Sequence, residues 1–358
     1  MAIPTKHKAL LLLSHAGSYE IRDVDVPMPD AGEVLIRVEA AALNPSDWRT
    51  RHTEYSFILP GYPAHQGSDA AGVVVALGEG VTRFKVGDRV LHQGSYSNGE
   101  KLAAFQQYTA VPTDLVAKIP DNLTFDQAAT IPLALATSAI AFYQKRLEVD
   151  GGGGAGLLPF WKEGGRGKYS GKPILIFGGA SACGQYGIQF ARLSGFSPVI
   201  TTVSPSNMEL ALSLGATHTI DRSLSADALI EAVKAITSKP FHFIYDSVSS
   251  EETQNIGYDL LAPGGTIVIL LRSAVKEDKL TRDKTILTCW GSVHLDMHKE
   301  FGAEMYQHIT KWFEIGYLRT TATEYVPGGL SNIPGAQERV RSGKVGPRKL
   351  VVHPSETI

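Results

Sequence analysis

The segment from Pro173 to Gly195 constrains the fold more than any other stretch of the chain. It begins with the apolar run 174–177, turns through the small residues 178–184, and continues as an apolar helical pattern that stops at Gly195. A short β-branched run is typical of a buried parallel strand, and a glycine commonly ends a helix. Because free backbone N–H groups and the helix dipole point at the turn, this arrangement favours binding of an anion such as a pyrophosphate.

The turn itself departs from the G-x-G-x-x-G pattern of dinucleotide-binding proteins. Ser181 and Ala182 stand where glycines often lie, so the turn alone leaves an ordinary strand-to-helix connection open. A second strand, 197–203, follows directly and completes a βαβ unit of about the expected length. Strands and helices then alternate over roughly a hundred residues, which predicts a doubly wound parallel sheet.

The residues on either side of this region have a different pattern. Residues 1–120 contain short strands separated by Pro and Gly turns, which predicts β-barrel geometry, and the stretch 349–353 is expected to return to that part of the molecule. We therefore predict one domain of residues 1–132 and 273–358 and another of residues 133–272. A Gly-rich insertion, 150–171, lacks the Gly-Lys-Ser/Thr ending of a P-loop, and its composition predicts a flexible segment.

Composition excludes several classes of protein. The 358 residues carry 34 Lys and Arg against 36 Asp and Glu, so nothing indicates nucleic acid or an anionic membrane as a partner. Two cysteines, Cys183 and Cys289, are too few for a disulfide scaffold or a four-cysteine zinc site. The apolar run 9–13 is too short for a signal peptide, and no stretch approaches a transmembrane span. We expect a soluble cytoplasmic protein.

Motifs spread over nearly the whole chain carry a resemblance to a known family. They lie at 33–35 with 41–47, at 67–74, 86–90, 215–216, 342–344 and 349–352. The chain resembles the medium-chain dehydrogenase/reductase superfamily in its zinc-free quinone-oxidoreductase-like branch. The segments 178–181 and 204–207 and the insertion before Pro173 are similar to fungal trans-acting enoyl reductases that serve polyketide synthases. The resemblance implies an α/β protein with a GroES-like β-barrel catalytic domain, a Rossmann domain and an active site in the cleft between them.

Zinc is not expected. Zinc-dependent relatives carry Gly-His-Glu where this chain has Gly67-Ser68-Asp69, a ligand cysteine near 45–47, and four clustered cysteines elsewhere; none of these is present. His65 lies nearby, but a lone histidine without ligand partners is more often structural. Hydride transfer to an activated double bond needs no Lewis acid, because the substrate carbonyl accepts the charge and hydrogen-bond donors stabilise the enolate.

The choice of cofactor depends on the end of the second strand. A carboxylate there would bind the ribose 2′-OH of NAD, but this strand is followed by Ser204, Pro205, Ser206 and Asn207. Hydroxyl and amide donors suit a 2′-phosphate, which favours NADPH. Arg222 stands where the family often has tyrosine, and its guanidinium would pair with that phosphate, unless it is only a solvated surface arginine.

The resemblance implies the other site residues. Cofactor contacts are expected at Ser46, Asp47, Trp48, Arg49, Gly178, Gly179, Ala180, Ser181, Ala182, Cys183, Gly184, Leu270, Leu271, Arg348 and Lys349. Substrate contacts are expected at Ser138, Phe142, Tyr143, Cys289, Trp290 and Val293. Thr137 is expected near the nicotinamide, with Asn44 and Arg49 orienting its amide or the substrate carbonyl. Solvent, or Tyr143 if it faces the cleft, would protonate the α-carbon.

These observations lead to one main hypothesis and two alternatives. The main one is an NADPH-dependent reductase of the C=C bond of an enone, a quinone or an enoyl thioester, the last carried by a partner polyketide synthase. Because a fold does not determine chemistry, a non-catalytic NADPH-binding protein is an alternative, and a zinc alcohol dehydrogenase is another. A monomer and a homodimer are both compatible with the sequence.

Overall fold

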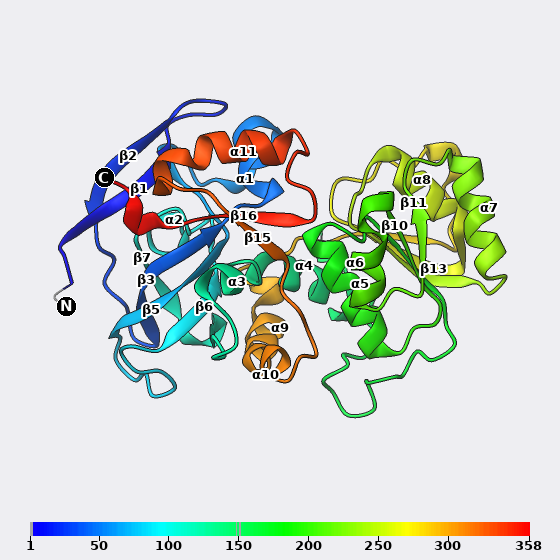
Figure 1. Ribbon diagram of the computed structural model, residues 1–358, viewed down its shortest axis with the longest axis horizontal. Coiled ribbons are helices and arrows are strands. Elements are labelled where there is room, and N and C mark those ends of the chain that lie inside the picture. Colours follow the sequence, from blue (N-terminus) through cyan, green and yellow to red (C-terminus); the bar gives the residue numbers. More distant parts are fainter. Residues whose placement is uncertain (1–2, 148, 150–151) are drawn as a thin grey trace.

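The computed structural model describes residues 3–147, 149 and 152–358. The chain forms two domains that lie side by side along the long axis of the molecule (Figure 1). Both chain ends belong to one domain, and the middle of the chain, in green and yellow, forms the other. The predicted return of the last strand is confirmed, because β16 (Arg348–Val352) pairs with β3 (Glu33–Ala42).

The domain at the chain ends is built on a seven-stranded sheet. Its order is β15-β16-β3-β5-β6-β8, and β7 also pairs with β3; a three-stranded sheet, β2-β1-β4, accompanies it. The other strands are β1 (Lys6–Leu12), β2 (Tyr19–Asp25), β4 (Ala64–His65), β5 (Asp69–Leu77), β6 (Arg89–Gln93), β7 (Tyr108–Pro112), β8 (Val116–Lys118) and β15 (Ala322–Tyr325). The helices are α1 (Pro45–His52), the 3-10 helix η1 (Glu54–Ile58), α2 (Gly99–Leu102), α3 (Phe125–Ala129), α9 (Asp296–Tyr306), α10 (Ile309–Glu314) and α11 (Ile333–Arg341).

The second domain is a six-stranded parallel sheet with the order β11-β10-β9-β12-β13-β14. Its strands are β9 (Ile174–Phe177), β10 (Val199–Val203), β11 (His218–Asp221), β12 (Phe241–Asp246), β13 (Leu261–Ile269) and β14 (Thr285–Thr288), and its helices are α5 (Ala182–Ser194), α6 (Met208–Leu214), α7 (Ala226–Ile236) and α8 (Glu251–Leu260). The strand order reverses between β9 and β12, and ligands of such sheets bind at the carboxyl ends of the strands at that point.

One domain boundary was wrong. The sequence placed the end of the second domain at residue 272, but β14 pairs in parallel with β13 and is therefore part of the same sheet. The boundary could not be predicted because the segment between β13 and β14 is mostly polar, and its composition does not indicate that the chain returns to the same sheet.

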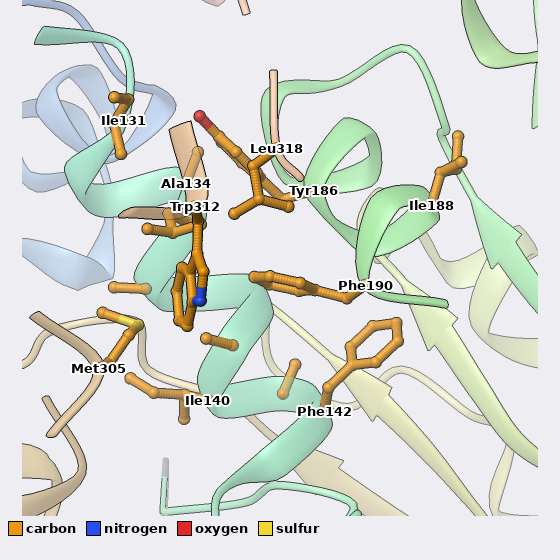
Figure 2. Packing of buried hydrophobic residues seen from close by; sticks show 14 of the residues in the cluster. Ile131, Ala134, Ile140, Phe142, Tyr186, Ile188, Phe190, Met305, Trp312 and Leu318 are labelled. Carbon is orange, nitrogen blue, oxygen red and sulfur yellow. The ribbon is translucent and has the colours of Figure 1, made fainter. Parts of the chain in front are cut away.

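Helix α4 (Pro132–Tyr143) joins the two domains. All of its residues except Leu133 are buried. Figure 2 shows Ile140 and Phe142 on this helix among Phe190, Trp312 and Met305. Contrary to the expectation from sequence, residues 125–143 pass a length and composition test for a membrane-crossing helix, but 78% of that window is buried inside the protein. Such burial is typical of a core helix.

The Gly-rich insertion is packed rather than flexible over its described residues, 152–171. Phe160 and Trp161 lie in an aromatic cluster, each with its ring centroid 5.0 Å from that of Trp312. The indole Nε1 of Trp161 donates to Glu304 Oε1 at 2.6 Å. The prediction of a flexible segment was therefore wrong here. Glycine content indicates conformational freedom, but two large aromatic side chains bury enough apolar area to hold the segment in place.

Candidate active site

The small-residue turn forms a tight passage from β9 into α5. Gly178 has a φ of 74°, and a Cβ on Gly184 would lie 2.2 Å from the carbonyl oxygen of Gly178, so neither position accepts another residue without strain. The Ser181 hydroxyl caps the helix by accepting from the backbone N–H of Gly184 at 2.9 Å. The turn thus presents the N-terminus of a thirteen-residue helix at the switch point of the sheet, as the sequence predicted.

A second polar group lies at the carboxyl end of β10. Arg222 follows β11, and its backbone N–H donates to the Val203 carbonyl at 3.0 Å, which places it next to Ser204. The Asn207 amide donates to Ser204 Oγ at 2.9 Å. The structure therefore brings the residues predicted to bind the 2′-phosphate together: Ser204, Ser206, Asn207 and Arg222. The adjacent Asp221 carboxylate accepts from its own turn, at Ser223.

Helix α1 carries Ser46, Trp48 and Arg49 from the barrel side. The Arg49 guanidinium lies over the Trp48 ring, 4.5 Å from its centroid, and burial lowers the pKa of Arg49. In the following turn, the Tyr55 hydroxyl accepts from the backbone N–H of Arg272 at 3.1 Å, directly after the predicted contacts Leu270 and Leu271. η1, directly behind α1, therefore reaches the carboxyl edge of the parallel sheet.

Aromatic side chains continue this contact between the domains. The rings of Phe57, on η1, and Trp290, after β14, have centroids 5.9 Å apart, and Phe57 is 54% exposed. Sequence reasoning included Trp290 but missed Tyr55 and Phe57. The available signal was weak: two aromatic residues, separated by one serine, in the short segment behind α1.

A buried ion pair lies where the barrel meets α4. Lys349 Nζ donates to Asp69 Oδ2, to Asn44 Oδ1 at 2.9 Å and to the Thr130 carbonyl at 3.5 Å, and the side chains of Asp69 and Lys349 are 0% and 4% exposed. Asp69 Oδ1 accepts from the N–H of Leu133 in the first turn of α4, at 2.6 Å. These contacts use all three ammonium protons. The prediction that Lys349 contacts the cofactor is therefore wrong in this structure, because burial commits the charge to Asp69.

Beside the ion pair lie three hydroxyls and one carboxyl that contact each other, here called the Tyr96 cluster: Tyr96, Ser46, Ser68 and Asp47. The phenol donates to Asp47 Oδ1 at 2.7 Å, accepts from Ser68 Oγ at 2.7 Å, and lies 3.1 Å from Ser46 Oγ. Asp47 Oδ2 accepts from the Asn44 N–H at 2.7 Å. Burial raises the pKa of Asp47 to about 7 and that of Tyr96 well above its usual range.

The Tyr96 cluster shows that the prediction for Asp47 was wrong and that one polar residue, Tyr96, was not predicted from the sequence. Asp47 was expected to contact the cofactor, but its carboxyl is fully buried beneath α1 and bonded within the protein. Tyr96 was missed, because it follows β6 in a polar loop without a recognisable motif. Ser46, by contrast, is only half-buried and stands in the first turn of α1.

Thr137 and the segment 289–293 are packed together. Thr137 Oγ1 donates to the Leu133 carbonyl at 2.7 Å, and a Cβ on Gly291 would lie 1.9 Å from that oxygen. Gln93 holds the segment to the barrel, since its amide donates to the Gly291 carbonyl at 2.9 Å and accepts from the Val293 N–H at 2.7 Å. Gln93 is a positioning residue that the sequence analysis did not identify.

Of the two cysteines in this region, Cys289 is buried and Cys183 is half-buried. The Cys289 thiol donates to the Thr137 carbonyl at 3.5 Å. Burial raises the pKa of Cys183 to about 11 and that of Cys289 further, so neither thiol forms a thiolate readily near neutral pH.

Five of the six predicted substrate contacts lie in the protein interior, each at most 3% exposed: Ser138, Phe142, Tyr143, Cys289 and Val293. The Phe142 ring packs against Phe190, with centroids 6.0 Å apart, as Figure 2 shows. The Tyr143 hydroxyl lies 2.8 Å from Ser194 Oγ on α5, and Ser138 Oγ donates to the Cys183 carbonyl at 2.8 Å. The prediction is wrong for Ser138, Phe142 and Tyr143 because α4 is enclosed on nearly every side. It is wrong for Cys289 and Val293 as well, because both side chains are buried. Tyr143 therefore does not face the cleft as a proton donor.

The remaining predicted cofactor residues lie near the domain junction. The backbone N–H of Leu270 donates to Ser249 Oγ at 2.8 Å. The Gln185 amide donates to the carbonyls of Ala180 and Pro347 at 3.0 and 3.2 Å. It therefore links the small-residue turn between β9 and α5 to the segment before Arg348. Arg348 itself is exposed and lies 3.7 Å from Glu324. Among the described residues, no group of three or more His, Cys, Asp or Glu is placed to hold a metal ion.

Family models match both parts of this architecture. The model described as "Alcohol dehydrogenase GroES-like domain" matches residues 30–121, and that described as "Zinc-binding dehydrogenase" matches residues 182–290. A GroES-like barrel joined to a Rossmann-type sheet with a small-residue turn at its switch point defines a two-domain, nicotinamide-dependent oxidoreductase.

Two similar proteins of known name indicate where the chain lies among these oxidoreductases. The chain is 30% identical over 369 residues to a trans-enoyl reductase of Penicillium sp., covering 98% of this chain and 99% of that protein. It is 30% identical to the enoyl reductase component of the lovastatin nonaketide synthase of Aspergillus terreus, over 98% and 96% of the two chains. The protein belongs to the medium-chain dehydrogenase/reductase superfamily, which includes these fungal trans-enoyl reductases.

Solved structures have the same fold. An alcohol dehydrogenase superfamily protein from Novosphingobium aromaticivorans matches with a TM-score of 0.79 at 24% identity, over 97% of this chain and 99% of that one. A crotonyl-CoA carboxylase/reductase in complex with NADP matches with a TM-score of 0.76 at 18% identity, over 100% and 96% of the two chains. At these identities the likeness concerns the fold.

Proposed function

We propose that the protein reduces the C=C bond of an α,β-unsaturated carbonyl compound with hydride from NADPH, without zinc. The observation that carries this proposal is the donor set at the positions where zinc-dependent relatives have ligands. Ser46 and Ser68 contact the Tyr96 phenol, and Asp69 is held by the Lys349 ammonium. Hydroxyls that are already hydrogen-bonded to each other are poor ligands for Zn²⁺, but they suit proton transfer and the orientation of a carbonyl.

The proposed choice of NADPH rests on the residues behind β10. A 2′-phosphate there would meet the Arg222 guanidinium and the side chains of Ser204 and Asn207, with no carboxylate at the end of the strand to repel it. The Asp221 carboxylate is turned toward Ser223.

The proposed substrate is an enoyl thioester carried by a polyketide synthase. This proposal draws on the relatives, two of which are named for enoyl reduction, one as a component of a polyketide-forming synthase. Phe57, exposed beside Trp290 where the domains meet, is suited to contact the acyl chain.

When bound, the nicotinamide supplies the hydride, and the chain's residues position the reactants. Thr137 Oγ1 donates to its own helix but keeps lone pairs that can accept from the carboxamide. Arg49 is the candidate donor to the carbonyl oxygen as the enolate forms. Asn44 was predicted to touch the ligand, but its amide bonds to Asp69 and Lys349, so it positions the ion pair instead.

NADPH-oxidation assays with an enoyl thioester, a simple enone and a quinone test this function. We expect turnover of the thioester with the largest kcat/KM, weaker turnover of the enone, and NADPH strongly preferred to NADH. Reduction of the quinone alone would indicate a quinone reductase. Tight NADPH binding without turnover of any of the three substrates would indicate a binding protein.

A further inference from the structure

The reaction proposed above needs a proton at the α-carbon, and the residue considered from the sequence does not supply it. Tyr143 is 3% exposed, and its hydroxyl lies 2.8 Å from Ser194 Oγ on α5. The Tyr96 cluster, in contrast, joins a buried carboxyl to a half-buried serine on α1, the helix that carries Arg49.

The hydrogen bonds of the Tyr96 cluster form a chain with a direction. A phenol oxygen has one proton to donate and lone pairs to accept others. With Asp47 ionised, the Tyr96 proton goes to Asp47, as the structure shows, and Ser68 donates to the phenol oxygen. If Asp47 carries a proton, it becomes the donor, and the Tyr96 proton is free to turn to Ser46 Oγ, 3.1 Å away. The Ser46 proton is then free to turn away from Tyr96, on the exposed side of this half-buried serine.

Burial makes the buried end of this chain able to hold a proton. Asp47 is fully buried and lies in a region with the Asp69 carboxylate, which opposes its ionisation, and the Lys349 ammonium, which favours it. The other titratable groups facing Asp47 are Tyr96 and Tyr19. Desolvation is the largest effect, so the neutral form of Asp47 persists to a much higher pH than that of an exposed aspartate.

We propose that Asp47, Tyr96 and Ser46 form a proton relay that protonates the α-carbon of the substrate, an inference that rests on the proposed function. The enolate electron pair forms the new C–H bond with the Ser46 proton as the carbonyl reforms. Ser46 takes the Tyr96 proton, and Tyr96 takes the Asp47 proton. Asp47 is left as a carboxylate and is reprotonated from water through Ser46 after the product leaves, so atoms and charge balance and the relay itself undergoes no redox change.

The test compares Tyr96→Phe with Tyr19→Phe. Both remove one phenol from the polar region under α1, and Tyr19 bonds to Gln66 and Gln337 rather than to Asp47. We expect Tyr96→Phe to lower kcat by about 10²-fold, the lower end for loss of a general acid, with NADPH affinity unchanged. Tyr19→Phe should keep both kcat and the pH profile of the wild type. A Tyr96→Phe variant with normal kcat and an unaltered pH profile would overturn the relay.

Two further measurements separate the relay from folding and from the function itself. Ser46→Ala should lower kcat and Ser46→Thr should restore it, whereas equal loss in both would contradict a role for the hydroxyl. In the cofactor-free protein, the Asp47 carboxyl, followed by carbon NMR, should titrate near pH 7 and higher in Tyr96→Phe, because the phenol favours ionisation. Titration near the ordinary aspartate value would overturn the relay, even if no substrate were turned over.

Discussion

Two polar regions flank the proposed cofactor site, and they are built in opposite ways. On the barrel side, Asp69, Lys349 and Asp47 are buried and every one of them has a partner within the protein. On the Rossmann side, Ser206 and Arg222 are exposed, and the side chains behind β10 bond mainly to each other. Removing the partner of a buried charged group lowers the free energy of unfolding strongly, whereas substituting an exposed residue changes it little. We therefore expect the buried region to determine the free energy of unfolding and its dependence on pH. The exposed region should determine the affinity for the cofactor.

The largest effect is expected for Lys349→Met. The Asp69 carboxylate would remain buried without a countercharge, so the free energy of unfolding should fall by about 3–5 kcal/mol. Denaturant unfolding measures this loss. The double variant Asp69→Asn/Lys349→Met should regain most of it, because no charge is left unpaired. A single variant as stable as the wild type would show that the pair is not a structural element.

The pH dependence of stability should come from the buried region. Because the pKa of Asp47 is raised from 3.8 to about 7 on folding, the folded state binds the proton more tightly, and the free energy of unfolding should fall as pH rises from about 4 to about 7. Asp246, whose pKa burial raises to about 6, contributes in the same direction. In Asp47→Asn the decline, measured by unfolding at several pH values, should be smaller. An unchanged decline would assign it to Asp246 or other groups.

Arg222→Ala should act on binding and spare stability. Loss of a charge-assisted bond worth about 1.5–3 kcal/mol should raise the Kd for NADPH by about 10- to 100-fold and leave the Kd for NADH unchanged. The free energy of unfolding should change by less than about 0.5 kcal/mol. Arg282→Ala, an exposed arginine before β14 at the other end of the strands, is the matched control. Equal weakening of both cofactors in Arg222→Ala would refute the 2′-phosphate assignment.

The smallest effect is expected for the cysteines that lie between the two regions. A double Cys183→Ser/Cys289→Ser variant should keep most of kcat with normal NADPH affinity, because both thiols have raised pKa values and the proposed reaction has no covalent enzyme intermediate. Steady-state kinetics checks this expectation. A loss comparable to that expected for Tyr96→Phe would point to a thiol in the chemistry.

Much of the fold was predictable because its signals are local. The run 174–177 became β9 without a change of bounds, and Gly195 ends α5 in a left-handed conformation with a φ of 87°. Such features depend on neighbouring residues, whose sterics and hydrogen bonds operate within one turn or strand. The grouping behind β10 was also predictable, because parallel strands end at the same edge of a sheet.

The sequence by itself determined the two-domain architecture, the glycine positions of the turn and the residues at the end of β10, because each depends on local pattern and strand order. Only the tertiary structure decided which of the candidate residues are buried and which partners they have: it enclosed Phe142 and Tyr143, paired Lys349 with Asp69, and placed Tyr96 against Asp47 and Ser46. In the chain, Asp47 and Tyr96 are 49 residues apart, Ser46 and Tyr96 are 50 apart, and Asp69 and Lys349 are 280 apart. Contacts of such separation arise from packing of whole elements, and desolvation follows from that packing rather than from local sequence.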